Sequence, residues 1–248
     1  MNKEMVAYIV KKIFQQNKNN NPDFVDIFTE EGNAWYEDFR DYCYLGKHRL
    51  RYTVSNGATK TVILFEDMGD SYLAGLEDWV IKFDKCYNAG YCGREVALYK
   101  HFKSKGFEHF LCPVYYGGTI DGYPFYIAER AWVEPDYIQQ ETYKQYEHEY
   151  GQYWHGADSN KLWSEFRDIE PEEFVELMFN HFGVDSEAVD DLIELLVDYD
   201  VNDLHSGNIG ILDNEPVLID YSGCHDEESF SAKYGSRDYG IKPQILAA

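Results

Sequence analysis

The chain has 248 residues, which is long enough for one sizeable core or two small lobes. Hydrophobic residues make up 44% of it, a content that excludes general disorder. Its formal net charge of −23 argues against a nucleic-acid backbone or an anionic membrane as partner. The five cysteines, none spaced as C-x-x-C, favour a reduced, cytoplasmic protein, and no apolar run reaches the length of a membrane span.

The first predicted element is an amphipathic helix over Lys3–Gln16. Its apolar residues recur at helical spacing, which favours packing on a core over binding a partner: Met5, Val6, Ile9, Val10, Ile13 and Phe14. The stretch 17–22 holds four asparagines and a proline, so we expect the helix to end before it.

Short runs rich in Tyr, Val, Ile and Thr follow from Tyr42 and indicate strands. The expected strands are Arg49–Val54, Lys60–Glu66, Glu77–Phe83, Leu111–Tyr116 and Tyr123–Ala131. The first two would form a hairpin around residues 55–59. Two further helices are expected near the other end, at Pro171–Phe182 and Ser186–Tyr199.

A helix over Gly90–Lys103 places a carboxylate among apolar residues. Glu95 shares one helical face with Cys92, Leu98, Tyr99 and Phe102. It is the only carboxylate of that helix, and a buried carboxylate needs a partner. Lys82, at the end of the W-V-I-K strand, is the predicted partner, although a lysine at a strand end often reaches solvent instead.

The stretch Val201–Gly223 holds three groups with affinity for hard cations. It is predicted to form a polar loop, a strand, the turn Asp213–Pro216 and a return strand. Asn208 and Asp220 would meet at one end of this hairpin, where an amide and a carboxylate suit Mg²⁺. Asp203 is a candidate to accept a proton from an attacking hydroxyl. The alternative is an ordinary solvated turn.

The segments D-L-H-S-G-N, at 203–208, and L-I-D-Y-S, at 218–222, resemble the catalytic loop and metal-binding segment of protein-kinase-like phosphotransferases. The resemblance is nearest to the aminoglycoside and choline kinase branch. It implies that Asp203 is catalytic and that Asn208 and Asp220 bind Mg²⁺. It also implies that Lys82 contacts the α- and β-phosphates of ATP and that Glu95 holds this lysine.

The phosphate-covering loop of such enzymes corresponds to the turn 55–59. Only Gly57 remains of the three glycines in the pattern G-x-G-x-x-G. The backbone N–H groups of this turn, together with Lys60, are candidates to hold phosphates. A plain hairpin turn explains the same residues.

The resemblance implies an α+β, two-lobe fold. Residues 1–132 would form an N-lobe with the N-terminal helix, an antiparallel sheet and a helix like the glutamate-bearing helix of kinases. Residues 133–248 would form a minimal helical C-lobe with the catalytic loop. The implied activity is transfer of the γ-phosphoryl group of ATP to a hydroxyl of a small molecule or protein. The alternative is a nucleotide-binding pseudokinase that serves as a protein-interaction module. The Tyr- and Glu-rich stretch 134–167 suits either substrate contact or internal packing.

Overall fold

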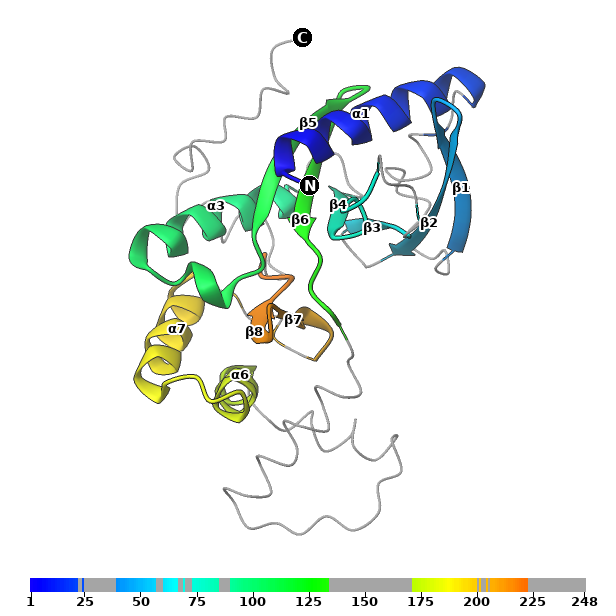
Figure 1. Cartoon of the computed structure of the whole chain (residues 1–248). Helices are drawn as coiled ribbons and strands as arrows, with labels where there is room; N and C mark the ends of the chain where they lie inside the picture. The colour runs from blue at the N-terminus through cyan, green and yellow to red at the C-terminus, as the bar shows by residue number, and fades with distance from the viewer. Residues whose placement is uncertain are drawn as a thin grey trace. The chain divides into compact units, whose positions relative to one another are not determined.

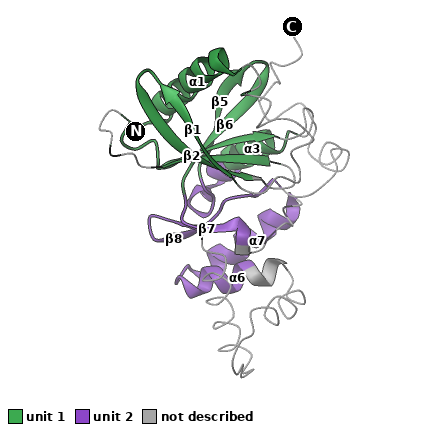
Figure 2. Ribbon diagram, turned by 90° about the vertical axis from the view of Figure 1, so that its right-hand side faces the viewer, with its two compact units in different colours: residues 1–101, 113–130, 236–248 green, residues 102–112, 131–235 purple. Residues whose placement is uncertain are grey.

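The computed structural model describes residues 1–21, 24, 39–56, 60–66, 69, 73–84, 90–133, 171–199, 201, 204 and 206–222. These residues form an α+β structure with a six-stranded antiparallel sheet, four α-helices and a separate two-stranded sheet (Figure 1). They fall into two compact units (Figure 2). Unit 1 takes in described residues from 1–101 and 113–130, and unit 2 those from 102–112 and 131–222.

The large sheet belongs to unit 1 and has the order β1-β2-β3-β4-β6-β5, with every neighbouring pair antiparallel. Its strands are β1 (Phe39–Leu45), β2 (His48–Asn56), β3 (Lys60–Phe65), β4 (Trp79–Asp84), β5 (Val114–Ile120) and β6 (Tyr123–Glu129). The five expected strands are present with shifted ends, and β1 is an addition. Most of the side chains of β1 are exposed, so its sequence lacks the apolar alternation that marks a half-buried strand.

Helix α1 (Lys3–Asn20) covers one face of this sheet. Its buried stripe packs with Ile63, Phe65, Ile81 and Phe83 in one hydrophobic core. The predicted end at Gln16 was wrong, because Asn17 is buried and bonded within the structure. Its Nδ2 donates to the carbonyl of Ile13 at 2.6 Å and to that of Tyr44 at 2.8 Å. These partners stabilise an asparagine that the local sequence disfavours in a helix.

Helix α3 (Tyr91–Lys105) follows β4 along the chain, and its predicted apolar face is buried. The register of β3 and β4 pairs Lys60 with Asp84 and Val62 with Lys82. Successive side chains of a strand point to opposite faces, so these residues lie on the face away from Ile63 and Ile81. Polar and charged residues of the sheet are therefore presented on the side opposite to α1.

Unit 2 contains α6 (Pro171–His181), α7 (Ser186–Asp198) and the hairpin β7 (Ile209–Leu212) and β8 (Glu215–Leu218). Both helices lie within one residue of their predicted bounds. Asp185 caps α7, since its Oδ1 accepts the N–H groups of Glu187 and Ala188. None of the helices in the described ranges has the length and apolarity needed to cross a membrane.

Candidate functional site

The predicted ion pair between β4 and α3 is present in unit 1. The Nζ of Lys82 donates to Oε2 of Glu95 at 2.9 Å. The Glu95 side chain is fully buried, and that of Lys82 is 9% exposed. The prediction succeeded because helical spacing turns Glu95 toward the sheet and strand alternation turns Lys82 toward the helix.

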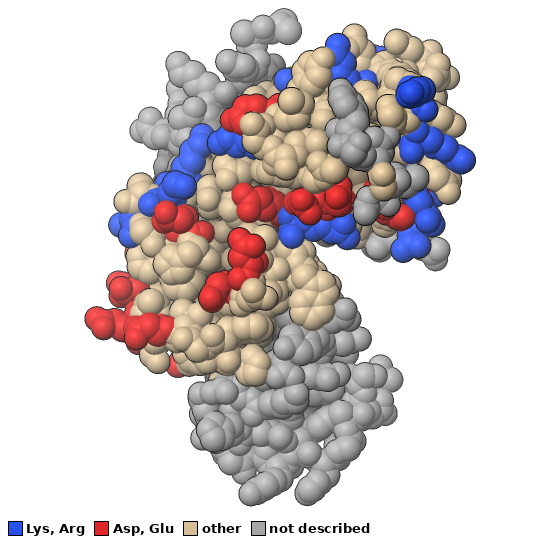
Figure 3. All heavy atoms as spheres, viewed as in Figure 1, with Lys and Arg blue, Asp and Glu red and all other residues tan. Residues whose placement is uncertain are grey.

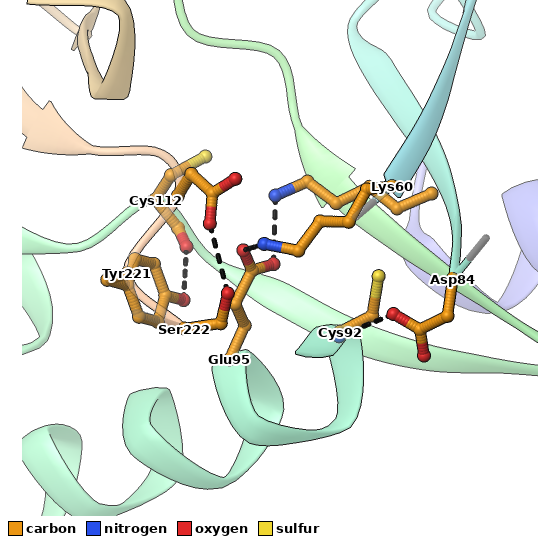
Figure 4. A network of polar contacts seen from close by, with 9 residues as sticks. Lys60, Asp84, Cys92, Glu95, Cys112, Tyr221 and Ser222 are labelled. Atoms are coloured by element: carbon orange, nitrogen blue, oxygen red, sulfur yellow. Dashed lines mark hydrogen bonds and ion pairs between the residues drawn. The ribbon is translucent and has the colours of Figure 1, made fainter. Parts of the chain in front are cut away.

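A second lysine binds the same carboxylate. The Nζ of Lys60, at the start of β3, lies 2.6 Å from Oε1 of Glu95, and the Lys60 side chain is 4% exposed. Each oxygen of Glu95 thus bonds to a different ammonium group (Figure 4). The sequence marked Lys60 as a candidate phosphate ligand but gave no sign of this contact, which depends on the pairing of β3 with β4.

This triad, defined as Lys60, Lys82 and Glu95, is costly to bury unless all its charges are paired. Ionised groups taken from water lose several kcal/mol of hydration, and close opposite charges recover it only with good geometry. The two short bonds to Glu95 provide that geometry. Two ammonium groups meet one carboxylate, so the triad by itself carries a net positive charge.

Asp84 helps to orient α3 beneath the two lysines. Its Oδ1 accepts the backbone N–H of Cys92 at 2.9 Å, so a carboxyl group sits at the positive end of the helix. Cys92 and Glu95 are three residues apart and share a face of α3. Burial raises the pKa of Asp84, while the bonds from Cys92 and the nearby Lys60 act in the opposite direction. Sequence reasoning did not single out Asp84.

The thiol of Cys92 lies near Asp84 and Glu95 and is unreactive there. Its side chain is fully buried, and burial raises the pKa of the thiol well above its ordinary value, with Asp84 and Glu95 adding to the effect. A thiol that stays protonated is a poor nucleophile and a poor metal ligand. Cys92 therefore contributes packing to the site.

In unit 2, the β7–β8 hairpin brings Asn208 and Asp220 to the same end, as predicted. Asp213 and Asn214 form the two-residue turn with positive φ angles of 52° and 70°, typical of the tight turns that suit hairpins. Beyond the last cross-strand pair, the N–H of Ile219 donates to the carbonyl of Asn208 at 2.9 Å. Asn208 is buried and Asp220 is half-buried.

The residues after Asp220 hold that end of the hairpin in place. The hydroxyl of Ser222 donates to Oδ1 of Asp220 at 3.1 Å. The hydroxyl of Tyr221 donates to the carbonyl of Cys112 at 2.9 Å, and its ring is fully buried. The two residues that follow Asp220 are thus held by hydrogen bonds within unit 2; Figure 4 shows Tyr221 beside Cys112.

Gly210 in β7 is required by a close approach of two backbones. A Cβ at this position would lie 2.7 Å from the Cβ of Ala131 and 3.1 Å from Cγ2 of Ile219. Residue 132 runs alongside, with reciprocal 2.8 Å backbone bonds between Trp132 and Ile211. Residues 131 and 132 therefore pack directly on the hairpin, within unit 2.

Two of the predicted site residues, Gly57 and Asp203, lie outside the described residues. The structure brings together Lys60, Lys82 and Glu95 in unit 1, and Asn208 with Asp220 in unit 2. Within the described ranges, no three His, Cys, Asp or Glu side chains gather as a group able to hold a metal ion. One carboxylate with an amide oxygen is a smaller donor set, of the kind that Mg²⁺ completes with water and phosphate oxygens.

Comparisons with known proteins identify no relative. No protein-family model, no curated protein and no solved structure matches this chain.

Proposed function

We propose that the chain is an ATP- and Mg²⁺-dependent phosphotransferase of protein-kinase-like, two-lobe fold. The observation that carries the proposal is the buried bond from Lys82, on a central strand of an antiparallel sheet, to Glu95 of the helix beside it. Kinase-like enzymes use a strand lysine held by a helix glutamate to bind the α- and β-phosphates of ATP. In this proposal residues 1–132 are the N-lobe and residues 133–248 the reduced C-lobe.

The triad suits a triphosphate by its charge and its rigidity. Lys82 would contact the phosphates, and Lys60 would keep Glu95 paired when Lys82 turns toward them. If Glu95 were paired with Lys82 alone, its buried negative charge would lose its partner when Lys82 turned toward the phosphates. An unpaired buried charge is costly. Glu95 has one oxygen for each lysine, so the two tasks are divided.

The end of the β7–β8 hairpin suits a magnesium ion. Asn208 supplies an amide oxygen and Asp220 a carboxylate, both hard donors, and the backbone bond at Ile219 holds the two residues in one register. Bound Mg²⁺ would neutralise charge on the transferring phosphoryl group. Asp203, five residues before Asn208, would orient and deprotonate the acceptor hydroxyl.

The order of these groups along the chain is the other support. Lysine, helix glutamate, loop aspartate, loop asparagine and strand-end aspartate follow one another at 82, 95, 203, 208 and 220. Phosphoryl transfer asks chiefly for positioning and for neutralisation of charge, so five well-held groups suffice for the reaction. The acceptor is a hydroxyl of a small molecule or of a protein.

The proposal is tested with purified full-length chain in two steps. The first step is the shift in melting temperature on adding Mg-ATP, and the second is release of ADP in the presence of amino alcohols, aminosugars or a generic protein acceptor. A shift together with acceptor-dependent ADP release is the expected result. A shift with neither ADP nor phosphorylated product would make the chain a nucleotide-binding module, and no shift would overturn both assignments.

A further inference from the structure

The outer face of the β1–β2 hairpin gathers arginine and tyrosine side chains. The register pairs Tyr42 with Arg51 and Tyr44 with Arg49, and Arg40 lies two residues before Tyr42. Cross-strand partners and alternate residues of a strand share one face, so these five residues form a single surface, called here the Arg–Tyr face. The opposite face of the hairpin carries Cys43, Leu50, Tyr52 and Val54 into the core.

The Arg–Tyr face is open to solvent. Tyr42 and Tyr44 are 40% and 43% exposed, a large exposure for two neighbouring aromatic rings. The side chains of Arg40 and Arg51 are 66% and 40% exposed. Figure 3 shows Lys and Arg side chains gathered over β1 and β2, in a chain whose net charge is −23. Within the described residues, this is a local cationic surface on an anionic protein.

Two contacts hold the arginines in position. The guanidinium carbon of Arg49 lies 3.6 Å from the centre of the Tyr42 ring, so the two side chains make a cation–π contact. The Nε of Arg40 lies 3.7 Å from Oε1 of Glu66, and the Nε of Arg51 lies 3.3 Å from Oε2 of the same carboxylate. Glu66 thus offers one carboxylate to two guanidinium groups. The face is preorganised and keeps an excess of positive charge.

A partner meets this surface through side chains and cannot simply extend the sheet. β1 is an edge strand, but α1 occupies its edge at Tyr44. Asn17 donates to the Tyr44 carbonyl at 2.8 Å and accepts the Tyr44 N–H at 2.9 Å, as a neighbouring strand would. Gln16 does the same for Gly46. Strand addition is therefore blocked at the Tyr44–Gly46 end of this edge, whereas the side chains of Tyr42, Tyr44 and Arg51 are exposed.

We propose that the Arg–Tyr face docks a short acidic peptide segment of a partner protein. Guanidinium groups bind carboxylates through paired hydrogen bonds, and tyrosine and arginine are the residues that anchor protein interfaces. A long polyanion would extend past the face and meet the repulsion of the remaining negative charge. The charges of a short segment stay within about one Debye length, roughly 8 Å, of the arginines, so salt does not fully screen their attraction. This inference is independent of the proposed phosphotransferase activity.

The test is fluorescence anisotropy of a labelled oligoglutamate peptide with purified full-length chain, with oligolysine and oligouridine as comparison probes. We expect binding of oligoglutamate that weakens as salt is added. Arg49→Glu and Arg51→Glu should each weaken it about tenfold or more, equivalent to at least about 1.4 kcal/mol. Lys100→Glu is the matched control, because it makes the same charge change at an exposed position of α3 and should leave binding nearly unchanged.

Three results would overturn the proposal. The first is that Lys100→Glu weakens oligoglutamate binding as much as the arginine variants do, which would mean that only net charge matters. The second is tighter binding of oligouridine than of oligoglutamate. The third is no binding of oligoglutamate at all. Tyr44→Ser is a second variant that changes no charge and keeps both contacts of Glu66. It should weaken binding while circular dichroism and melting temperature stay close to those of the unchanged chain.

Discussion

Lys60 and Lys82 bond to different oxygens of one buried carboxylate, that of Glu95, at 2.6 Å and 2.9 Å. The two lysines come from neighbouring antiparallel strands and the glutamate from a helix, so three elements meet at one ion-paired centre. This relationship makes Glu95 important both for the stability of unit 1 and for the proposed nucleotide site.

Replacement of Glu95 should be strongly destabilising. Glu95→Gln leaves two buried ammonium groups without their carboxylate, and breaking a buried ion pair from one side costs about 3–5 kcal/mol. We expect urea denaturation to show a loss of this size in the free energy of unfolding. Glu4→Gln, at an exposed position of α1, is the control and should change it by no more than about 0.5 kcal/mol. A similar small loss for both variants would contradict the role of the triad.

The two lysines should differ in their effect on nucleotide binding. Lys82→Met and Lys60→Met each remove one ammonium group from Glu95, but only Lys82 is assigned to the phosphates. Calorimetry with Mg-ATP should show at least about tenfold weaker binding for Lys82→Met, about 1.4 kcal/mol, and a smaller loss for Lys60→Met. In both variants the remaining lysine keeps Glu95 paired, so each should be less destabilised than Glu95→Gln. Equal losses of affinity would rule out this division of tasks.

Asp203 should matter for turnover and not for nucleotide binding. Asp203→Asn removes the proposed proton acceptor while keeping nearly the same shape. We expect ADP release to slow by about 10²–10⁴-fold, the usual scale for a general base, with the Mg-ATP melting shift retained. Loss of the melting shift together with the rate would instead assign Asp203 to binding.

Asp220 should be required for the dependence on Mg²⁺. Asp220→Asn removes the carboxylate of the proposed metal site, so ATP should raise the melting temperature equally with and without Mg²⁺. ADP release should fall to background. Ser222→Ala, which removes only the hydroxyl that donates to Asp220, serves as the matched control and should keep most of the metal dependence. An unchanged response to Mg²⁺ in Asp220→Asn would place the metal elsewhere.

The buried carboxyl of Asp84 should make stability depend on pH. Its pKa is raised above the ordinary 3.8, chiefly by burial. Below pH 3.8 the group is protonated in both states, so it does not oppose folding. As pH rises through the raised pKa, the folded chain must ionise a buried group that the unfolded chain ionises more easily, and the free energy of unfolding falls.

Asp84→Asn tests this dependence, because the amide oxygen can still accept the Cys92 N–H. We expect the free energy of unfolding of the variant, relative to the unchanged chain, to increase as pH rises above 3.8 and to level off beyond the raised pKa. Urea denaturation at a series of pH values measures the difference. A difference that does not vary with pH would show that Asp84 titrates normally.

Periodic patterns along the chain were sufficient for most of the elements. The stripe of α1, the helices α6 and α7 and the β7–β8 hairpin were predicted from residues close in sequence. The same local logic predicted that Glu95 faces the core and needs a cation. The exposed strand β1 and the last turn of α1 were missed, because their stability comes from contacts such as Asn17 with Tyr44, 27 residues apart.

By itself, the sequence determined that Glu95 carries a charge into apolar surroundings and that Asn208 and Asp220 stand at one end of a hairpin, because both follow from periodicities of 3.6 and two residues. Only the tertiary structure decided that Lys60 joins Lys82 on Glu95 and that Asp84 holds the start of α3. Those contacts depend on which strands pair and in which register, and this pairing is set by packing among residues far apart in the chain.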